Sequence, residues 1–311
     1  MRAAQINSYG DSSVIQINEI SNPSVENGKV IIEVYASSIN PIDWKLREGY
    51  LKDYVPLNFP VTLGGDFSGV VKEVGESVEN FKVGDKVFGQ AGVLNGGSGA
   101  MAEFALATSS KVISMPSNLD FPESASLPLV GVSAIQAIEE EINIQKDQKI
   151  LIHGGAGGIG SIAIQIAKAR GAYVATTVGT KDIDFVKSLG ADEVIDFKVQ
   201  KFEDILSGYD GVFDTVGGET TTNSFKVLKS GGILVSMAGQ PDEDLAQKHN
   251  VKAIGQKSDA TPDRLSRLKE LIESGKVKPI IDKVFPFTEV KEAFVYQEKS
   301  HPRGKVVLQI K

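Results

Sequence analysis

Apolar positions in the middle of the chain follow two periods in turn. Residues 149–153 form a short apolar run, typical of a strand that a parallel sheet buries on both faces. From residue 159 to 170 the apolar residues recur at helical spacing, and Gly171 stands where that helix is expected to end. The alternation of strand and helix continues beyond it, which predicts an α/β fold with a doubly wound parallel sheet. Further strands are expected over residues 172–178, 193–196, 211–216 and 233–238, and further helices over residues 181–189 and 219–229.

The first 120 residues have a different pattern, of short β segments separated by Gly, Pro and Asn. Residues 29–36, 68–74 and 86–89 are examples. This region is expected to form an all-β or mixed barrel, and an alternating strand at residues 305–310 could return to close it. The glycine-rich residues 92–99 are interpreted as a flexible surface linker.

Length and composition narrow the classes of function. A chain of 311 residues is long enough for two domains. The net charge of -7 and the lack of a basic stripe argue against nucleic-acid binding. No apolar run approaches the length of a membrane span, and residues 1–6 are interpreted as a strand rather than a signal peptide, so a cytoplasmic location is expected. The absence of cysteine excludes disulfides and thiolate metal sites.

A glycine motif connects the first strand to the first helix. Gly155, Gly157 and Gly160 have the spacing G-x-G-x-x-G, which permits a tight turn, close approach of a pyrophosphate and close packing of helix on strand. The helix N-terminus offers unpaired N–H groups and a positive dipole end to phosphates. The predicted cofactor-binding loop is therefore Gly155, Ala156, Gly157, Gly158, Ile159 and Gly160.

Several short segments occur in an order that resembles a known family. They are residues 38–45, 63–69, 83–87, 127–131, the glycine motif and residues 304–307. With them the chain resembles the zinc-free branch of the medium-chain dehydrogenase/reductase superfamily, in particular quinone oxidoreductases and alkenal (enone) reductases. The resemblance implies a GroES-like catalytic β-barrel domain over residues 1–120, completed by residues 281–311, and a Rossmann NADP-binding domain over residues 121–280. The active site would lie near the carboxyl ends of the Rossmann strands.

The resemblance also bears on zinc. Asn40 and Gly65 stand where zinc-dependent relatives have a cysteine and a histidine ligand. The three histidines of the chain are too far apart in sequence to replace them locally, so no catalytic zinc is expected. Without a metal to stabilise an alkoxide, the favoured hydride acceptor is a quinone or a C=C conjugated to a carbonyl, whose oxygen takes up the charge.

The candidate catalytic residues are Asn40, Asp43 and Lys45. The family likeness puts Asn40 near nicotinamide and substrate, whereas its alternative role is a polar cap before Pro41. Lys45 could hold the substrate oxygen or be a solvated helix lysine. We expect Asp43 to be exposed and ionised, and to orient Lys45 or the backbone. Tyr50 stands one position short of a tyrosine found in many of these reductases, which puts a tyrosine proton donor in doubt.

NADPH is the expected cofactor. After the second strand, no acid precedes Asp182, and small hydroxyl residues followed by a lysine suit a 2′-phosphate. Phe197 replaces a tyrosine common in relatives, with Lys198 as a possible substitute contact. The predicted phosphate contacts are Thr177, Thr180, Lys181 and, on family grounds, Arg303. The remaining cofactor-lining residues are expected to be Ser133, Val216, Gly217, Ala238 and Gly239, whereas His153 is interpreted as a buried structural residue.

These features predict an NADPH-dependent oxidoreductase acting on a small-molecule quinone or enone. Two alternatives stay open: an enoyl-thioester reductase, and a non-catalytic NADPH-binding redox sensor. The family likeness suggests a homodimer formed through an edge strand of the Rossmann sheet, either the fifth strand or a following one near residues 251–254.

Overall fold

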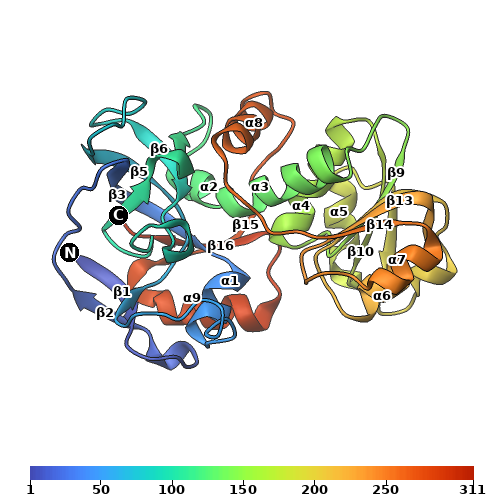
Figure 1. Cartoon of the computed structure of the whole chain (residues 1–311), viewed down its shortest axis with the longest axis horizontal. Helices are drawn as coiled ribbons and strands as arrows, with labels where there is room; N and C mark the ends of the chain where they lie inside the picture. Colours follow the sequence, from blue (N-terminus) through green and yellow to red (C-terminus); the bar gives the residue numbers. More distant parts are fainter. The chain divides into compact units, whose positions relative to one another are not determined.

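The computed structural model describes all 311 residues, which form two compact units (Figure 1). Unit 1 consists of Met1–Leu129, Ala260–Glu273 and Pro279–Lys311, and unit 2 of Val130–Asp259 and Ser274–Lys278. No helix combines the length and the apolar character needed to cross a bilayer.

Unit 2 is built on a six-stranded, fully parallel sheet with the strand order β11-β10-β9-β12-β13-β14. The order reverses between β9 and β12, where a doubly wound sheet opens its ligand crevice. The strands are β9 (Lys149–His153), β10 (Tyr173–Val178), β11 (Glu193–Asp196), β12 (Tyr209–Asp214), β13 (Leu228–Ser236) and β14 (Lys252–Gly255). The helices lying wholly in this unit are α4 (Gly158–Ala169), α5 (Ile183–Ser188), α6 (Glu219–Ser224) and α7 (Glu243–His249), together with the π-helical turn η4 (Gln136–Glu141). The predicted fold class is confirmed.

One predicted helix of this unit is too long. Helix α6 ends at Ser224, whereas the sequence pattern extended it to Lys229. Leu228 already belongs to β13, where it pairs with Tyr209 of β12. The pair Gly231-Gly232, interpreted as the end of the helix, instead lies inside β13 at a shift of register. Pairing with β12 therefore overrides the local helical pattern.

Unit 1 contains a seven-stranded sheet and a three-stranded sheet (Figure 1). The long strand β3 (Lys29–Ile39) lies at the centre of the larger one, and β16 (Lys305–Gln309) pairs antiparallel with it. The C-terminal strand thus returns to the N-terminal region, as predicted. The other strands of the larger sheet are β5 (Asp66–Val74), β6 (Lys86–Gln90), β7 (Phe104–Thr108), β8 (Val112–Ser114) and β15 (Ile281–Pro286), and the smaller sheet consists of β1 (Arg2–Ile6), β2 (Gln16–Glu19) and β4 (Val61–Thr62).

Unit 1 includes three segments outside the predicted first domain, namely residues 121–129, 260–273 and 279–280. Helix α2 (Phe121–Ala125) is held to β5, because Ser68 Oγ donates to the Phe121 carbonyl at 2.6 Å. Helix α8 (Pro262–Glu273) is held to β8, because Lys269 Nζ donates to Ser114 Oγ at 2.7 Å. The sequence pattern places these segments in the second domain. Contacts across the chain that sequence spacing does not reveal place them in the first unit.

The remaining helices of the chain are α1 (Pro41–Arg47), α3 (Pro128–Ile135), α9 (Val290–Ser300) and the short 3-10 turns η1 (Ser12–Val14), η2 (Val93–Asn95), η3 (Ser109–Lys111), η5 (Thr180–Asp182), η6 (Phe202–Asp204) and η7 (Phe287–Glu289). The segment expected to be a flexible linker contains η2 and is tied to its surroundings. Asn95 Nδ2 donates to Gln90 Oε1 at 3.1 Å, and Gly99 N donates to the Ala91 carbonyl at 2.8 Å. The segment is thus an ordered turn in this structure.

Candidate active site

The glycine loop lies at the carboxyl end of β9, beside the point where the strand order reverses. A Cβ at Gly155 would lie 2.1 Å from Thr176 Oγ1, and one at Gly160 would lie 2.2 Å from the Gly154 carbonyl oxygen. A Cβ at Gly157 would meet only that same oxygen, at 3.4 Å. Packing therefore requires the first and third glycines, whereas the second has open space next to its backbone.

Helix α4 starts directly after this open position. Its first internal hydrogen bond runs from Ser161 N to the Gly157 carbonyl at 3.0 Å. The N–H groups of Gly158, Ile159 and Gly160 come before that bond, so the helix itself supplies no acceptor for them. Three backbone donors at the positive end of a twelve-residue helix form a cradle that suits a pyrophosphate.

Thr177, at the end of the neighbouring strand β10, does not serve as the phosphate donor that we predicted. Its Oγ1 lies 2.9 Å from Nδ1 of the buried His153, whose Nε2 lies 3.0 Å from Ser224 Oγ. The Ser224 hydroxyl donates its own proton to the Thr220 carbonyl, so Nε2 must carry the imidazole proton and Nδ1 must accept. The Thr177 hydroxyl thus donates its proton to His153 Nδ1, so toward a ligand Thr177 Oγ1 can only accept a hydrogen bond.

His153 has the structural role that we expected. It is fully buried, and burial lowers its pKa to about 4 against the opposing effect of Asp214. The neutral imidazole connects three elements, because it is part of β9 and bonds to β10 and α6.

Asp196 stands beside the predicted 2′-phosphate site, and sequence reasoning missed it. In the parallel register, Val178 at the end of β10 pairs with Asp196 at the end of β11. Thr180 Oγ1 donates to Asp196 Oδ2 at 2.6 Å, and this hydrogen bond is the main cause that lowers the Asp196 pKa. Continuing the predicted strand order to the third strand would have found this acid. Thr180 is thus held by a carboxylate, in addition to any contact with a nucleotide.

Two lysines lie close to the same strand ends. Lys181 is exposed in the turn η5. Lys198 follows Phe197, whose side chain is 62% exposed, and both approach Gly179, where a Cβ would lie 3.5 Å from Lys198 Cε and 3.7 Å from Phe197 Cζ. The residues around the ends of β10 and β11 thus bring two cations and one exposed aromatic ring together with one acid.

The loops after β12 and β13 meet, as the predicted cofactor crevice requires. Asp214 accepts hydrogen bonds from Val216 N at 2.8 Å and Gly217 N at 3.1 Å, which turns the chain sharply after β12. A Cβ at Gly217 would lie 2.5 Å from Ala238 Cβ, so the two loops pack directly against each other. Val216 is 57% exposed there, whereas the Ser133 hydroxyl is buried and lies 2.6 Å from Ser258 Oγ.

In unit 1, Asn40 is the residue before α1 and is only 1% exposed. Its side-chain oxygen accepts a hydrogen bond from Lys305 Nζ at 2.5 Å, and its Nδ2 donates to Asp66 Oδ2 at 2.8 Å. Lys305 Nζ also donates to the Ile39 carbonyl at 2.5 Å. Lys305, on β16, and Asp66, on β5, flank Asn40 because both strands pair with β3.

Two buried carboxylates surround this lysine. Asp66 also accepts from Gln90 Nε2 at 2.9 Å, and Asp43 Oδ2 accepts from Asn40 N at 2.7 Å. Burial is the main cause that raises the pKa of Asp43 to about 7, and it also raises the pKa of Asp66. Burial lowers the pKa of Lys305 to about 8, while Asp66 and Asp43 oppose that shift. We call Asn40, Asp43, Asp66 and Lys305 the buried polar cluster.

The expectation of an exposed, ionised Asp43 was wrong, because α1 folds its first turn inward and removes that side chain from water. Asp43 does orient backbone, namely the Asn40 N–H. Lys45 instead lies exposed on the other side of α1, with its Nζ 5.7 Å from the centre of the Trp44 ring. Tyr50, which is 68% exposed, packs edge-on against Trp44 at 5.8 Å.

The other candidate, Arg303, belongs to unit 1, where its backbone N–H donates to Asp282 Oδ1 at 3.3 Å. No group of three or more His, Cys, Asp or Glu side chains in the chain has an arrangement that could hold a metal ion. The cation within the buried polar cluster is the ammonium of Lys305.

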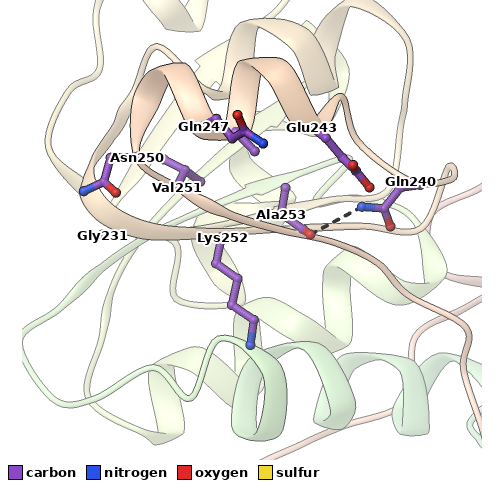
Figure 2. A pocket seen from close by; sticks show the side chains of 9 residues that line it. Gly231, Gln240, Glu243, Gln247, Asn250, Val251, Lys252 and Ala253 are labelled. Atoms are coloured by element: carbon purple, nitrogen blue, oxygen red, sulfur yellow. Dashed lines mark hydrogen bonds between the residues drawn. The ribbon is translucent and has the colours of Figure 1, made fainter.

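A hollow of about 580 Å³ lies elsewhere in unit 2, between α7 and the free edge of β14. Figure 2 shows Gln240 reaching the strand there, with its Nε2 donating to the Ala253 carbonyl at 3.5 Å. The Oε1 of Gln240 also accepts from Gly255 N at 2.9 Å. None of the predicted catalytic or cofactor residues lines this hollow. Its walls are Gly231, Gln240, Glu243, Ala246, Gln247, Asn250, Val251, Lys252 and Ala253.

The reversed strand order, with a glycine loop after its first strand, defines unit 2 as a dinucleotide-binding domain. Comparison with known proteins also relates the chain to dehydrogenases. Residues 26–117 match the family described as "Alcohol dehydrogenase GroES-like domain", and residues 189–308 match "Zinc-binding dehydrogenase".

Whole-chain relatives identify the family more closely. The chain is 32% identical to the chloroplast envelope quinone oxidoreductase homolog of Arabidopsis thaliana, over 99% of this chain and 98% of that protein. It is 36% identical to the chloroplastic NADPH-dependent alkenal/one oxidoreductase of Arabidopsis thaliana, over 99% of this chain and 79% of that protein. The solved quinone oxidoreductase of Coxiella burnetii superposes with a TM-score of 0.90 at 32% identity, over 100% of this chain and 99% of that chain. The chain belongs to the medium-chain dehydrogenase/reductase superfamily, among its quinone oxidoreductases and alkenal reductases.

Proposed function

We propose that this protein is an NADPH-dependent oxidoreductase that reduces a quinone or the C=C of an α,β-unsaturated carbonyl compound without zinc. The observation that carries the proposal is the glycine loop: two of its glycines are required by packing, and Gly157 alone has an open backbone beside three helix N–H groups. The relatives named for quinone and for NADPH-dependent alkenal/one reduction support the reaction class.

The chain's own residues fit a bound NADPH, which supplies the hydride. The N–H groups of Gly158, Ile159 and Gly160 would hold the pyrophosphate. Lys181 and Lys198 would hold the 2′-phosphate, and Arg303 is a further candidate. Because the Thr177 proton is engaged by His153, this hydroxyl is left to accept from a ribose hydroxyl. Val216, Gly217, Ala238 and Gly239 would line the other half of the crevice.

A quinone or an enone needs little from the protein beyond orientation and a donor for its oxygen, where negative charge collects as hydride arrives. The side-chain amide of Asn40 can donate such a bond, and Lys45 is a second possible donor. Lys305 places one positive charge beside the two buried carboxylates and offsets part of their negative charge, which supports a site that works without zinc.

We further propose a homodimer through the β14 edge, in the cytoplasm. Strand β14 is the last strand of its sheet, so its outer edge is available for pairing with a second copy. Gln240 engages Ala253 and Gly255 along that edge, so the pairing has to displace it (Figure 2). Light scattering of the wild type and of Gln240→Ala tests the dimer, and a mass of one chain for both proteins would exclude it. Cell fractionation tests the location.

The reaction is tested by mixing the protein with NADPH and a panel of quinones, enals, enones and enoyl thioesters in the presence of a metal chelator. Loss of the absorbance of reduced nicotinamide with quinones or enones is the expected result. NADPH binding without turnover of any acceptor would instead indicate a redox sensor, and turnover of enoyl thioesters alone would change the substrate class.

A further inference from the structure

We infer that Lys305 is a positioning residue that makes Asn40 a stronger hydrogen-bond donor to the substrate oxygen. The inference rests on the proposed function, because it assigns a role to Lys305 in the same hydride transfer.

The orientation of the Asn40 amide is fixed from both sides. An ammonium can only donate, so the group 2.5 Å from Lys305 Nζ must be the amide oxygen. The nitrogen then faces Asp66 Oδ2 at 2.8 Å, which accepts one of its two hydrogens. The second hydrogen of Nδ2 makes no hydrogen bond within the chain. Neither partner is compatible with the flipped amide, so Lys305 and Asp66 together determine which way Asn40 presents its donor.

The ammonium also changes the amide electronically. A cation bonded to the amide oxygen draws electron density away from the nitrogen and makes its N–H groups more acidic, and such hydrogen bonds strengthen one another in a low-dielectric interior. Asn40, Asp43, Asp66 and Lys305 are all at most 5% exposed, so water does not screen this effect. A positive charge thus acts on the donor through one intervening amide.

The chemical step uses that donor directly. With NADPH bound, the acceptor would take a hydride at its electrophilic carbon, and its π pair would move to the carbonyl oxygen to give an enolate or phenolate. The second N–H of Asn40 stabilises that oxygen until water supplies a proton. Because the acceptor's own substituents can also spread this charge, the need for Lys305 is greatest with weakly electrophilic acceptors.

The first test compares Lys305→Met with the wild type over a series of aryl enones of graded electrophilicity. The variant is expected to lose kcat by about 100-fold with the weakest electrophiles and by less than about 10-fold with the strongest, within the range seen when oxyanion donors are removed. The dissociation constant of NADPH, measured by fluorescence, should stay within about 2-fold. Lys311→Met, which removes an exposed lysine bonded to Glu33, is the matched control. An equal loss with every acceptor would overturn the inference.

A second pair of variants separates positioning from folding. Lys305→Met leaves Asp43 and Asp66 without a counter-charge and can destabilise the unit, whereas Lys305→Met combined with Asp66→Asn removes this excess charge. Because Asp66 also holds the Asn40 amide, Asp66→Asn alone is the reference for this comparison. If Lys305 is only structural, the double variant has the same kcat as Asp66→Asn once the two melting temperatures match. The inference requires the double variant to be slower than Asp66→Asn, most of all with the weak electrophiles.

Lys305→Arg provides the conservative rescue. The Lys305 pKa is lowered to about 8 by burial, against the effects of the facing Asp66 and Asp43 carboxylates, so wild-type kcat should fall as the pH rises through that value. Arginine stays charged, so the alkaline fall should vanish in Lys305→Arg. An unchanged alkaline limb would contradict the inference.

A measurement without turnover separates this inference from the proposed function. In the NMR spectrum, the side-chain amide of Asn40 is expected to be shifted downfield in the wild type and to move upfield in Lys305→Met. An unmoved Asn40 signal refutes the role of Lys305 whatever the activity. A wild type that reduces no acceptor refutes the proposed function, and with it the catalytic use of this donor.

Discussion

Substituting the glycines of the loop one at a time separates their two roles, packing and phosphate binding. Gly157→Ala adds a methyl group whose nearest neighbour is the Gly154 oxygen at 3.4 Å, an ordinary contact, and the backbone at 157 has a φ of -75° that alanine adopts freely. The unfolding free energy should therefore change by no more than about 0.5 kcal/mol.

The affinity of Gly157→Ala for NADPH should change much more than its stability. The added methyl group lies where a pyrophosphate would approach the backbone, so it would cost about one charge-assisted hydrogen bond, or roughly 2 kcal/mol. That energy corresponds to about a 30-fold higher dissociation constant for NADPH. Gly160→Ala is the matched control, because its methyl group would lie 2.2 Å from the Gly154 oxygen and 2.8 Å from Gly155 Cα. It should destabilise the fold by about 1–3 kcal/mol.

The assay is a pair of measurements on each variant: chemical unfolding, and NADPH titration followed by fluorescence. Gly157→Ala should lose affinity without losing stability, and Gly160→Ala should lose stability. Wild-type affinity in Gly157→Ala would show that no phosphate approaches the loop, and the assignment of the cofactor site would fail.

Three further results are expected. Lys181→Glu should weaken NADPH by at least about 10-fold while leaving NADH within about 2-fold, because only the former has a 2′-phosphate; equal effects in titrations of the two cofactors would remove Lys181 from that site. His153 has a pKa of about 4 in the fold and an ordinary value of 6.5. As the pH falls, this histidine is therefore protonated in the unfolded chain before it is protonated in the folded protein. The contribution of His153 to the unfolding free energy should thus be complete above pH 6.5 and decrease toward pH 4, at up to about 1.4 kcal/mol per pH unit. In urea titrations at several pH values, His153→Gln should make the unfolding free energy less dependent on pH in this range. Lys45→Ala should lower kcat for an enone with little effect on NADPH binding, and wild-type turnover would show that this exposed lysine is only solvated.

The sequence was sufficient for the elements whose signals are local. Strand β9 and the glycine loop stand out because an apolar run, three spaced glycines and a helical pattern follow one another directly. The return of β16 to β3 was also predictable, because its alternating pattern matches the N-terminal β segments.

The buried polar cluster could not be found in the same way. Lys305 lies 265 positions from Asn40 in the chain, and no spacing rule connects them. Asp43 was interpreted as exposed because a single aspartate in a short helix usually faces water. In the folded unit it lies with Asp66 of β5 and Lys305 of β16, and only folding brings these residues to it. The same reason explains why the engagement of Thr177 by His153 was missed, since it depends on the parallel register of β9 and β10.

Hydride transfer from NADPH to an electrophilic carbonyl compound can be followed directly with an isotope label on the cofactor. The protein would be incubated, in the presence of a metal chelator, with NADPH carrying deuterium at nicotinamide C4 and with an enone, once for each C4 face. One of the two labelled cofactors is expected to deliver its deuterium to the carbon β to the carbonyl, with one NADPH consumed per product. Consumption of NADPH with no deuterium in the product from either face, or no consumption at all, would contradict it.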